Sequence, residues 1–158
     1  MRHINKDITT VTSGLILHGV NCQGKMASGV ALAIRTKWPA VYKSYMESYN
    51  YMKSKNFLWL GRAFPGYIDI ANELVVFNGF TQEYYGRDGR AYATVEAIQS
   101  CLEDVYKFAI ESGITDIYIP RIGCNLGGLN WDQVGPMIEE FETSKNGLIN
   151  ITVCDFNT

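Results

Sequence analysis

The sequence lacks an excess of basic residues, and it lacks a long hydrophobic run. Its 14 lysines and arginines stand against 16 aspartates and glutamates, which gives a formal net charge of −2. Proteins that bind the phosphate backbone of nucleic acids usually carry a basic surplus, so we expect no nucleic-acid partner. No apolar segment approaches the roughly 20 residues that cross a bilayer. Because the N-terminal segment is also polar, we expect neither a signal peptide nor a membrane partner.

Cysteine and histidine are too sparse to indicate a metal centre. The four cysteines form no CxxC pair and are spread along the chain at Cys22, Cys101, Cys124 and Cys154. Only His3 and His18 could join them as ligands, and this spacing matches no zinc site. The sequence therefore predicts no metal. We expect free thiols and a location in the reducing cytoplasm.

The sequence does contain an alternation of strand-like and helix-like segments. Short apolar runs such as Leu15-Ile16-Leu17 and Leu74-Val75-Val76-Phe77 are typical of strands that are covered on both faces. Further strands are expected at 57–60, 67–71, 117–120 and 148–154. The chain has 158 residues, 47% of them hydrophobic, and no Pro/Gly-rich linker, so we expect a single domain over residues 1–158. The alternation predicts an α/β fold, a three-layer α/β/α sandwich around a mixed sheet.

Helical patterns lie between these strands. After Thr94, apolar residues recur at spacings of three and four, which places them on one helical stripe; they are Val95, Ile98, Leu102, Val105 and Ala109. A second helix is expected to begin near Trp131, with Asn130 as its N-cap and Gln133 at the capping-box position. A third covers about 30–36, and a fourth begins near Val41.

Two glycine-rich loops each follow a strand and precede a helix. The first runs from His18 to Val30 and the second from Pro120 to Trp131. Glycine lets the backbone approach a ligand closely, and a helix N-terminus offers free amides to an anion. Each loop alone is equally compatible with an ordinary strand-to-helix turn, whereas the pair could hold one diphosphate from two sides. Neither loop matches the phosphate loop of nucleotide triphosphatases or the GxGxxG dinucleotide fingerprint.

At these residues the chain resembles the macrodomain family. Within that family it is most similar to the small ADP-ribose-1''-phosphate phosphatases and ADP-ribosyl hydrolases of phages, bacteria and eukaryotes. The resemblance covers nearly the whole chain, in the same order and spacing. It is carried by four segments, which are Lys6-Asp7-Ile8-Thr9, His18-Gly19-Val20-Asn21-Cys22-Gln23-Gly24 with Met26-Ala27-Ser28-Gly29-Val30-Ala31, Phe80-Thr81-Gln82, and Pro120-Arg121-Ile122-Gly123-Cys124-Asn125-Leu126.

The resemblance implies that the chain binds ADP-ribose or a close derivative and needs no cofactor. Asp7 would accept a hydrogen bond from the adenine amino group, and Ile8 would supply the neighbouring amide. Asn21 would contact the distal ribose, while His18 matches a histidine implicated in catalysis in a phosphatase-type relative. The diphosphate and distal ribose would be held by the two loops, at Met26, Ala27, Ser28, Gly29 and Val30 and at Gly123, Cys124, Asn125, Leu126 and Gly127. Arg121 and Ile122 would belong to the same site, with Arg121 pairing either with a phosphate or with a nearby carboxylate.

Two positions depart from the pattern of the relatives that remove ADP-ribose from glutamate. Those relatives have an aspartate where this sequence has Gly127, and a lysine in the stretch that here covers 79–87, where this chain has none. The departures weigh against lysine-dependent glycohydrolase chemistry. The same holds for relatives that remove ADP-ribose from DNA bases.

Three functions are therefore considered. The first is a monomeric phosphatase that converts ADP-ribose-1''-phosphate to ADP-ribose and phosphate, with His18 in proton transfer and Asn21 orienting the ribose. The second is a binder of ADP-ribose or a related nucleotide signal without turnover. The third is a glycohydrolase of ADP-ribosylated protein. Structural roles are the alternatives at each residue, since His18 could simply end a buried strand, Asn21 could form a turn and Asp7 could lie on the surface.

Overall fold

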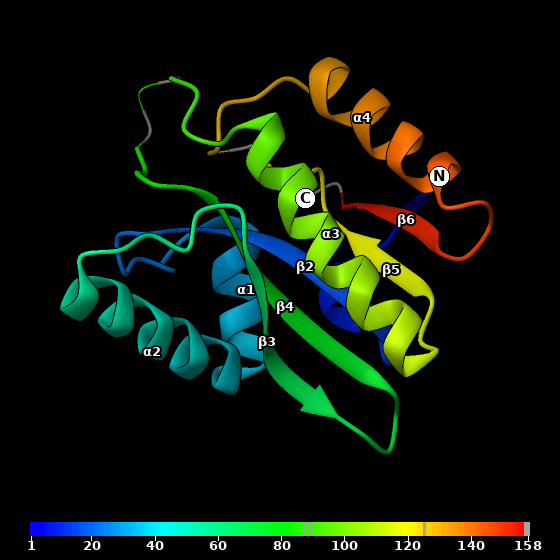
Figure 1. Cartoon of the computed structure of the whole chain (residues 1–158), viewed down its shortest axis with the longest axis horizontal. Coiled ribbons are helices and arrows are strands. Elements are labelled where there is room, and N and C mark those ends of the chain that lie inside the picture. The colour runs from blue at the N-terminus through cyan, green and yellow to red at the C-terminus, as the bar shows by residue number, and fades with distance from the viewer. Residues whose placement is uncertain (87, 89, 125, 157–158) are drawn as a thin grey trace.

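One mixed sheet organises the fold (Figure 1). The computed structural model of the chain describes residues 1–86, 88, 90–124 and 126–156. Within these residues the sheet has six strands in the order β1-β6-β5-β2-β4-β3. Neighbouring strands are parallel except for β3 and β4, which are antiparallel. The strands are β1 (Arg2–Asn5), β2 (Gly14–Asn21), β3 (Ala63–Asp69), β4 (Leu74–Gln82), β5 (Asp116–Ile119) and β6 (Asn150–Asp155).

Two helices cover each face of this sheet, which confirms the predicted α/β/α sandwich (Figure 1). One layer consists of α1 (Gly29–Lys37) and α2 (Pro39–Lys55), and the other of α3 (Val95–Ser112) and α4 (Trp131–Ser144). Side chains of β2 point alternately towards the two layers. Leu15 and Leu17 pack in the core under α3 and α4, whereas Ile16 and Val20 pack in the core under α1 and α2. Because both faces are covered, its side chains are buried on both sides.

The expected helices form where their sequence signals lie. Thr94 caps α3, because its hydroxyl accepts a hydrogen bond from the amide of Ala97 at 3.1 Å. At α4, Asn130 accepts from the amide of Asp132 at 2.9 Å, and Gln133 accepts from the amide of Asn130 at 3.3 Å. Both capping contacts predicted for α4 are therefore confirmed.

The prediction of a strand at 57–60 is wrong. These residues follow α2 without forming a strand, because their aromatic side chains form a cluster instead. Trp59 stacks on Tyr51 at 5.6 Å between ring centroids and meets Phe57 and Phe64 edge-on at 4.8 and 4.9 Å. A short apolar run does not distinguish such a cluster from a strand.

Two strands of the sheet edges differ from expectation. β1 was not predicted, because its polar sequence has no hydrophobic pattern; it pairs with β6 through Ile4 and Cys154. β3 begins four residues earlier than the expected strand, at Ala63 rather than residue 67, and its register with β4 shifts between Pro65 and Tyr67. An edge strand tolerates proline because one of its sides needs no ladder hydrogen bonds.

Candidate functional site

A cleft of about 690 Å³ runs along the carboxyl-terminal ends of the parallel strands. Each of these strands, or one of the two residues that follow it, contributes to its lining. Open α/β sheets place their ligands at this edge, beyond the strand ends. The described lining residues are Asp7, Ile8, His18, Gly19, Ser28, Gly29, Val30, Ala31, Ala33, Thr81, Gln82, Pro120, Arg121, Ile122, Gly123, Cys124, Leu126, Gly127, Cys154, Asp155 and Phe156.

The cleft brings together most of the residues predicted from the sequence. Those that line it are Asp7, Ile8, His18, Ser28, Gly29, Val30, Arg121, Ile122, Gly123, Cys124, Leu126 and Gly127. Asn21, Met26 and Ala27 are not among its described lining, and Asn125 lies outside the residues that the structure describes. The sequence analysis missed the end of β6, at Cys154, Asp155 and Phe156. Only the sheet order, which places β6 beside β1 and β5, identifies this contribution.

The N-terminus of α1 opens directly into the cleft. Ser28 is its N-cap in extended conformation, yet the Ser28 side chain makes no capping hydrogen bond. The first backbone bond of the helix runs from the amide of Leu32 to the carbonyl of Ser28 at 3.3 Å. The amides of Gly29, Val30 and Ala31 therefore have no partner within the helix. Since all three residues line the cleft, their N–H groups and the helix dipole form a place for an anion.

Asn21 uses its amide group to hold the first loop in shape. Its Nδ2 donates to the carbonyl of Lys25 at 2.8 Å, and its Oδ1 accepts from the amide of Gln23 at 2.9 Å. The buried hydroxyl of Tyr45 bonds to both the carbonyl and the Oδ1 of Asn21, at 2.8 and 2.7 Å. A contact between Asn21 and the distal ribose stays a prediction, and it would require the side chain to leave these bonds.

Met26 and Ala27, which lie in the same loop, take different positions. The Met26 side chain is 1% exposed and packs in the core under α1 and α2. Its carbonyl accepts a hydrogen bond from Arg35 Nη1 at 3.3 Å. Ala27 is exposed. The loop thus lines the cleft at His18 and Gly19, turns inward at Met26 and reaches the cleft again at Ser28.

Asp7 and Ile8 form the cleft wall at the end of β1. The Asp7 carboxylate caps the short 3-10 helix Ile8–Thr10. Its Oδ1 accepts from the amide and the hydroxyl of Thr9, at 2.9 and 2.8 Å. Ile8 is buried. Both bonds end on Oδ1, so an adenine contact through the other carboxylate oxygen stays a prediction.

His18 is a buried, neutral imidazole with a defined tautomer. Its side chain is 1% exposed, and Nε2 lies 2.6 Å from Oδ1 of Asn78. Asn78 Nδ2 donates to the carbonyl of Val41 at 3.1 Å, so Oδ1 must accept and His18 Nε2 must carry the proton. In the described part of the chain, His18 Nδ1 has no hydrogen-bond partner. Burial lowers the pKa of His18 to about 4, although the bond to Asn78 opposes the shift. At neutral pH the ring offers a bare acceptor and no charge.

The second loop is held by close backbone packing at its glycines. Gly123 has a φ of +78°, and a Cβ at this position would lie 2.7 Å from Cδ1 of buried Ile98. A Cβ at Gly127 would lie 2.6 Å from the carbonyl oxygen of Gly123. The same carbonyl accepts from the amide of Leu129 at 2.9 Å. The loop is therefore closed too tightly for side chains at these two positions.

Arg121 pairs with a carboxylate rather than standing free. Its Nε donates to Oδ1 of Asp155 at 2.8 Å, and His3 Nδ1 lies 2.8 Å from the other carboxylate oxygen. Burial alone would raise the pKa of Asp155, but hydrogen bonds from Arg121 and His3 hold it below its usual value. Of the two partners considered for Arg121, the structure shows the carboxylate.

The thiols in the cleft are protonated. Burial raises the pKa of both Cys124 and Cys154, so neither is an activated nucleophile. All four cysteines are free. In the described ranges, no group of three His, Cys, Asp or Glu side chains is placed to hold a metal ion, and no helix is long and apolar enough to cross a membrane.

Comparison with known proteins identifies the fold. The model of the Macro domain family matches residues 17–138, which includes both glycine-rich loops. The chain belongs to the macrodomain family. The macrodomain fold accounts for the mixed sheet and for the cleft at its carboxyl edge.

Relatives of this macrodomain include enzymes that act on ADP-ribose conjugates. It is 44% identical over 61 residues to the human ADP-ribose glycohydrolase OARD1, which covers 38% of each chain. It is 24% identical over 131 residues to the DNA ADP-ribosyl glycohydrolase of Mycobacterium tuberculosis, covering 81% of this chain and 34% of the relative. The macrodomain thus spans little more than a third of the length of these curated relatives.

Solved structures match over nearly the whole length. A protein of unknown function from Bacteroides thetaiotaomicron has a TM-score of 0.81 and 29% identity, and covers 98% of this chain and 97% of its own. The macrodomain of Mycobacterium tuberculosis DarG has a TM-score of 0.78 at 19% identity, covering 99% and 97%. The second likeness concerns the fold alone.

Proposed function

We propose that this macrodomain binds ADP-ribose, or a close derivative, along the cleft and hydrolyses ADP-ribose-1''-phosphate to ADP-ribose and phosphate. The observation that carries the proposal is the uncapped N-terminus of α1, which directs the amides of Gly29, Val30 and Ala31 into an elongated cleft. A diphosphate matches such a helix end in charge and in hydrogen-bonding capacity. The whole chain, residues 1–158, would act as one monomeric domain in the cytoplasm.

The order of the strands sets the direction of the ligand. Asp7 lies at the end of the cleft formed by β1 and β6, and Thr81 lies at the end formed by β4. With adenine at Asp7 and the diphosphate at α1, the distal ribose reaches the β4 end. The substituent at its 1'' position then lies near Thr81 and Gln82.

Hydrolysis of the phosphate ester requires water to attack phosphorus while the bond to the 1'' oxygen of the ribose breaks and that oxygen takes a proton. His18 suits the acceptance of a proton, because it is neutral and its Nδ1 has no partner among the described residues. Since the His18 side chain is buried, its participation requires that water gain access to Nδ1.

Two observations favour the phosphate ester over a glycosidic bond as the target. Gly127 stands where glutamate-directed relatives have an aspartate, and a side chain there would meet the backbone of Gly123 at 2.6 Å. The stretch 79–87 contains no lysine. The alternative, glycohydrolase action, is favoured by the relatives from human and Mycobacterium tuberculosis, which are both glycohydrolases. Binding without turnover is favoured by the burial of His18.

The test combines binding and turnover in one sample. We expect calorimetric titration with ADP-ribose to give saturable binding, and ADP-ribose-1''-phosphate to release inorganic phosphate. The His18→Gln variant should keep binding and lose turnover. Binding without phosphate release would support a binder, and release of ADP-ribose from a glutamate-modified protein would support the glycohydrolase. Absence of ADP-ribose binding would overturn the proposal for the cleft.

A further inference from the structure

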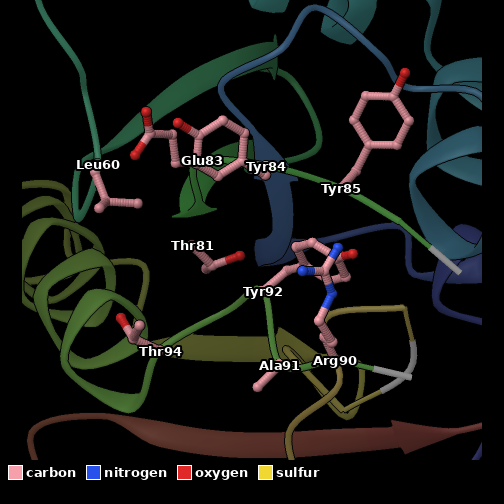
Figure 2. A pocket seen from close by; sticks show the side chains of 9 residues that line it. All are labelled: Leu60, Thr81, Glu83, Tyr84, Tyr85, Arg90, Ala91, Tyr92 and Thr94. Carbon is pink, nitrogen blue, oxygen red and sulfur yellow. The ribbon is translucent and has the colours of Figure 1, made fainter. Parts of the chain in front are cut away.

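A second cavity of about 530 Å³ lies beside the cleft (Figure 2). We call it the tyrosine pocket. It is lined by Leu60, Thr81, Glu83, Tyr84, Tyr85, Arg90, Ala91, Tyr92 and Thr94. In Figure 2, Glu83 and Tyr84 lie on one side of Thr81 and Tyr92 lies on the other, whereas the ring of Tyr85 lies off to one side. None of its tyrosines takes part in the proposed hydrolysis.

The tyrosine pocket begins where the cleft ends. Thr81, at the end of β4, lines both cavities. The amides of Tyr92 and Ala93 donate to the carbonyl of Gly127, at 2.7 and 3.0 Å, and Gly127 lines the cleft. One wall of the tyrosine pocket is therefore tied directly to the second loop. In the direction proposed for ADP-ribose, a group attached to the distal ribose at its 1'' position faces this pocket.

The lining of the tyrosine pocket combines an aromatic ring with an acidic group. The Tyr84 ring lines the pocket together with the half-buried Glu83, whereas Tyr92 already has the Arg90 guanidinium over its ring at 5.7 Å and the Tyr85 ring lies off to one side (Figure 2). The Glu83 carboxylate lies beside the Tyr84 hydroxyl (Figure 2), and hydrogen bonding to this carboxylate, together with its charge, raises the pKa of Tyr84. Arg90 is already paired, because its Nε donates to Oδ2 of Asp88 at 2.7 Å. Among the described lining residues, Glu83 is thus the charge without an opposite partner.

This combination matches a planar cation better than a phosphate. Aromatic faces attract cations through the ring quadrupole, and a nearby carboxylate adds Coulomb attraction. Inside the tyrosine pocket a phosphate would meet the carboxylate of Glu83 and would find Arg90 engaged by Asp88, so the phosphate of ADP-ribose-1''-phosphate stays in the cleft, at Thr81 and Gln82. The cavity is also far larger than one phosphate group requires, since it has the volume of a small-molecule site.

We propose that the tyrosine pocket binds a planar aromatic cation joined to the distal ribose, as in the pyridinium of an oxidised nicotinamide dinucleotide. Such a ligand is ADP-ribose with an N-linked ring at the 1'' position. The inference rests on the proposed function, because the cleft must hold the ADP-ribose part in the stated direction. It extends the substrate range of the site from a small phosphate ester to a ring-bearing ADP-ribose derivative.

The test compares three ligands by calorimetry, which are ADP-ribose, the oxidised dinucleotide and the reduced dinucleotide. The reduced ring has nearly the same size but no positive charge. We expect the oxidised form to bind about tenfold more tightly than either of the others, since a cation–π contact together with ion pairing to Glu83 is worth roughly one such factor. Glu83→Gln and Tyr84→Leu should each reduce the preference for the oxidised form over ADP-ribose to about twofold or less. The exposed control Glu139→Gln, on α4, should keep it.

The outcomes separate this inference from the proposed function. If ADP-ribose does not bind, the proposed function fails and the orientation of the ligand fails with it. If ADP-ribose binds but the oxidised dinucleotide binds no more tightly, the inference about the tyrosine pocket alone is wrong. A preference that persists undiminished in both Glu83→Gln and Tyr84→Leu would also overturn it. Thermal unfolding of each variant checks that the fold is intact.

Discussion

The two glycine-rich loops look alike in sequence and are built differently. The first loop is held by polar side-chain bonds, with Asn21 and Tyr45 at their centre, and it leads into a helix whose N-cap side chain makes no capping bond. The second loop is held by backbone contacts at Gly123 and Gly127, and it leads into a helix with a full capping box. The difference teaches that the first loop leaves the start of α1 without a side-chain cap, whereas the Asn130 side chain pairs with the amide of Asp132 at the start of α4. In the second loop, glycine serves mainly to make room for neighbouring atoms.

The largest expected effect tests the packing of the second loop. Gly123→Ala introduces a Cβ at 2.7 Å from Ile98 and strains a φ of +78°, so we expect a loss of about 2–5 kcal/mol in the free energy of unfolding. The matched control is Gly29→Ala in the first loop, where φ is +61° but no atom of the described residues lies within 4 Å of the new Cβ. It should cost only about 1–2 kcal/mol. Urea denaturation measures both, and equal losses would contradict the contrast between the loops.

A pH series tests whether His18, at which the polar first loop begins, is a neutral buried ring. Burial lowers the pKa of His18 from 6.5 to about 4. Between these two pKa values the unfolded state binds a proton that the folded state does not. The contribution of neutral His18 to the free energy of unfolding is therefore complete above pH 6.5 and is lost as the pH falls towards 4. The loss should reach about 3 kcal/mol over this window. Denaturation at pH 7 and pH 4 should show a smaller decrease for His18→Gln than for the wild type; the same decrease in both would argue against a neutral buried ring.

The Tyr45 hydroxyl is the next contact to remove. Tyr45→Phe takes away two hydrogen bonds to Asn21, in a fully buried position. We expect a loss of about 1–3 kcal/mol in unfolding free energy and weaker binding of ADP-ribose, because the first loop is no longer held in shape. Tyr51→Phe on the same helix is the control, since Tyr51 is 48% exposed. A Tyr45→Phe variant as stable as Tyr51→Phe would show that the polar bonds do not hold the loop.

The smallest effect concerns the two N-caps. Asn130→Ala should destabilise the protein by about 1 kcal/mol, because it removes the capping box of α4. Ser28→Ala at α1 should leave the unfolding free energy nearly unchanged, since its side chain makes no capping bond. Thermal unfolding of the two variants measures the difference directly. A larger cost at Ser28 would mean that α1 is capped in solution and is not open to an anion.

Local signals in the sequence predicted the parts of the fold that depend on local physics. The apolar stripe after Thr94 and the capping residues Asn130 and Gln133 specify α3 and α4, and the short apolar runs specify β2 and β4. The strand at 57–60 was mispredicted because an aromatic cluster and a strand share the same composition. β1 is a polar edge strand that depends on β6 for its hydrogen bonds, so no pattern within it could indicate it.

The parts of the candidate site where a loop follows a strand were predictable. The parts where a side chain could bond either to a ligand or to its own loop were less so. His18, the α1 terminus and the second loop reach the cleft because strand ends meet at one sheet edge. Asn21 has a side chain that fits either a ligand or a turn, and the sequence cannot show that Tyr45 lies beside it. The tyrosine pocket was equally hidden, because Leu60, Thr81 and Tyr92 meet only in three dimensions.

The pairing of β1 with β6 has a consequence for the order of folding. Arg2 lies beside Thr152 and Asn5 beside Asp155, so β1 has no partner in the sheet until β6 has been synthesised. Contacts between such distant residues form late, because closing a long loop has an entropic cost. The cleft needs both strands, as Asp7 and Phe156 line the same site. A nascent chain that has completed both glycine-rich loops therefore remains unable to close the cleft until synthesis has passed β6.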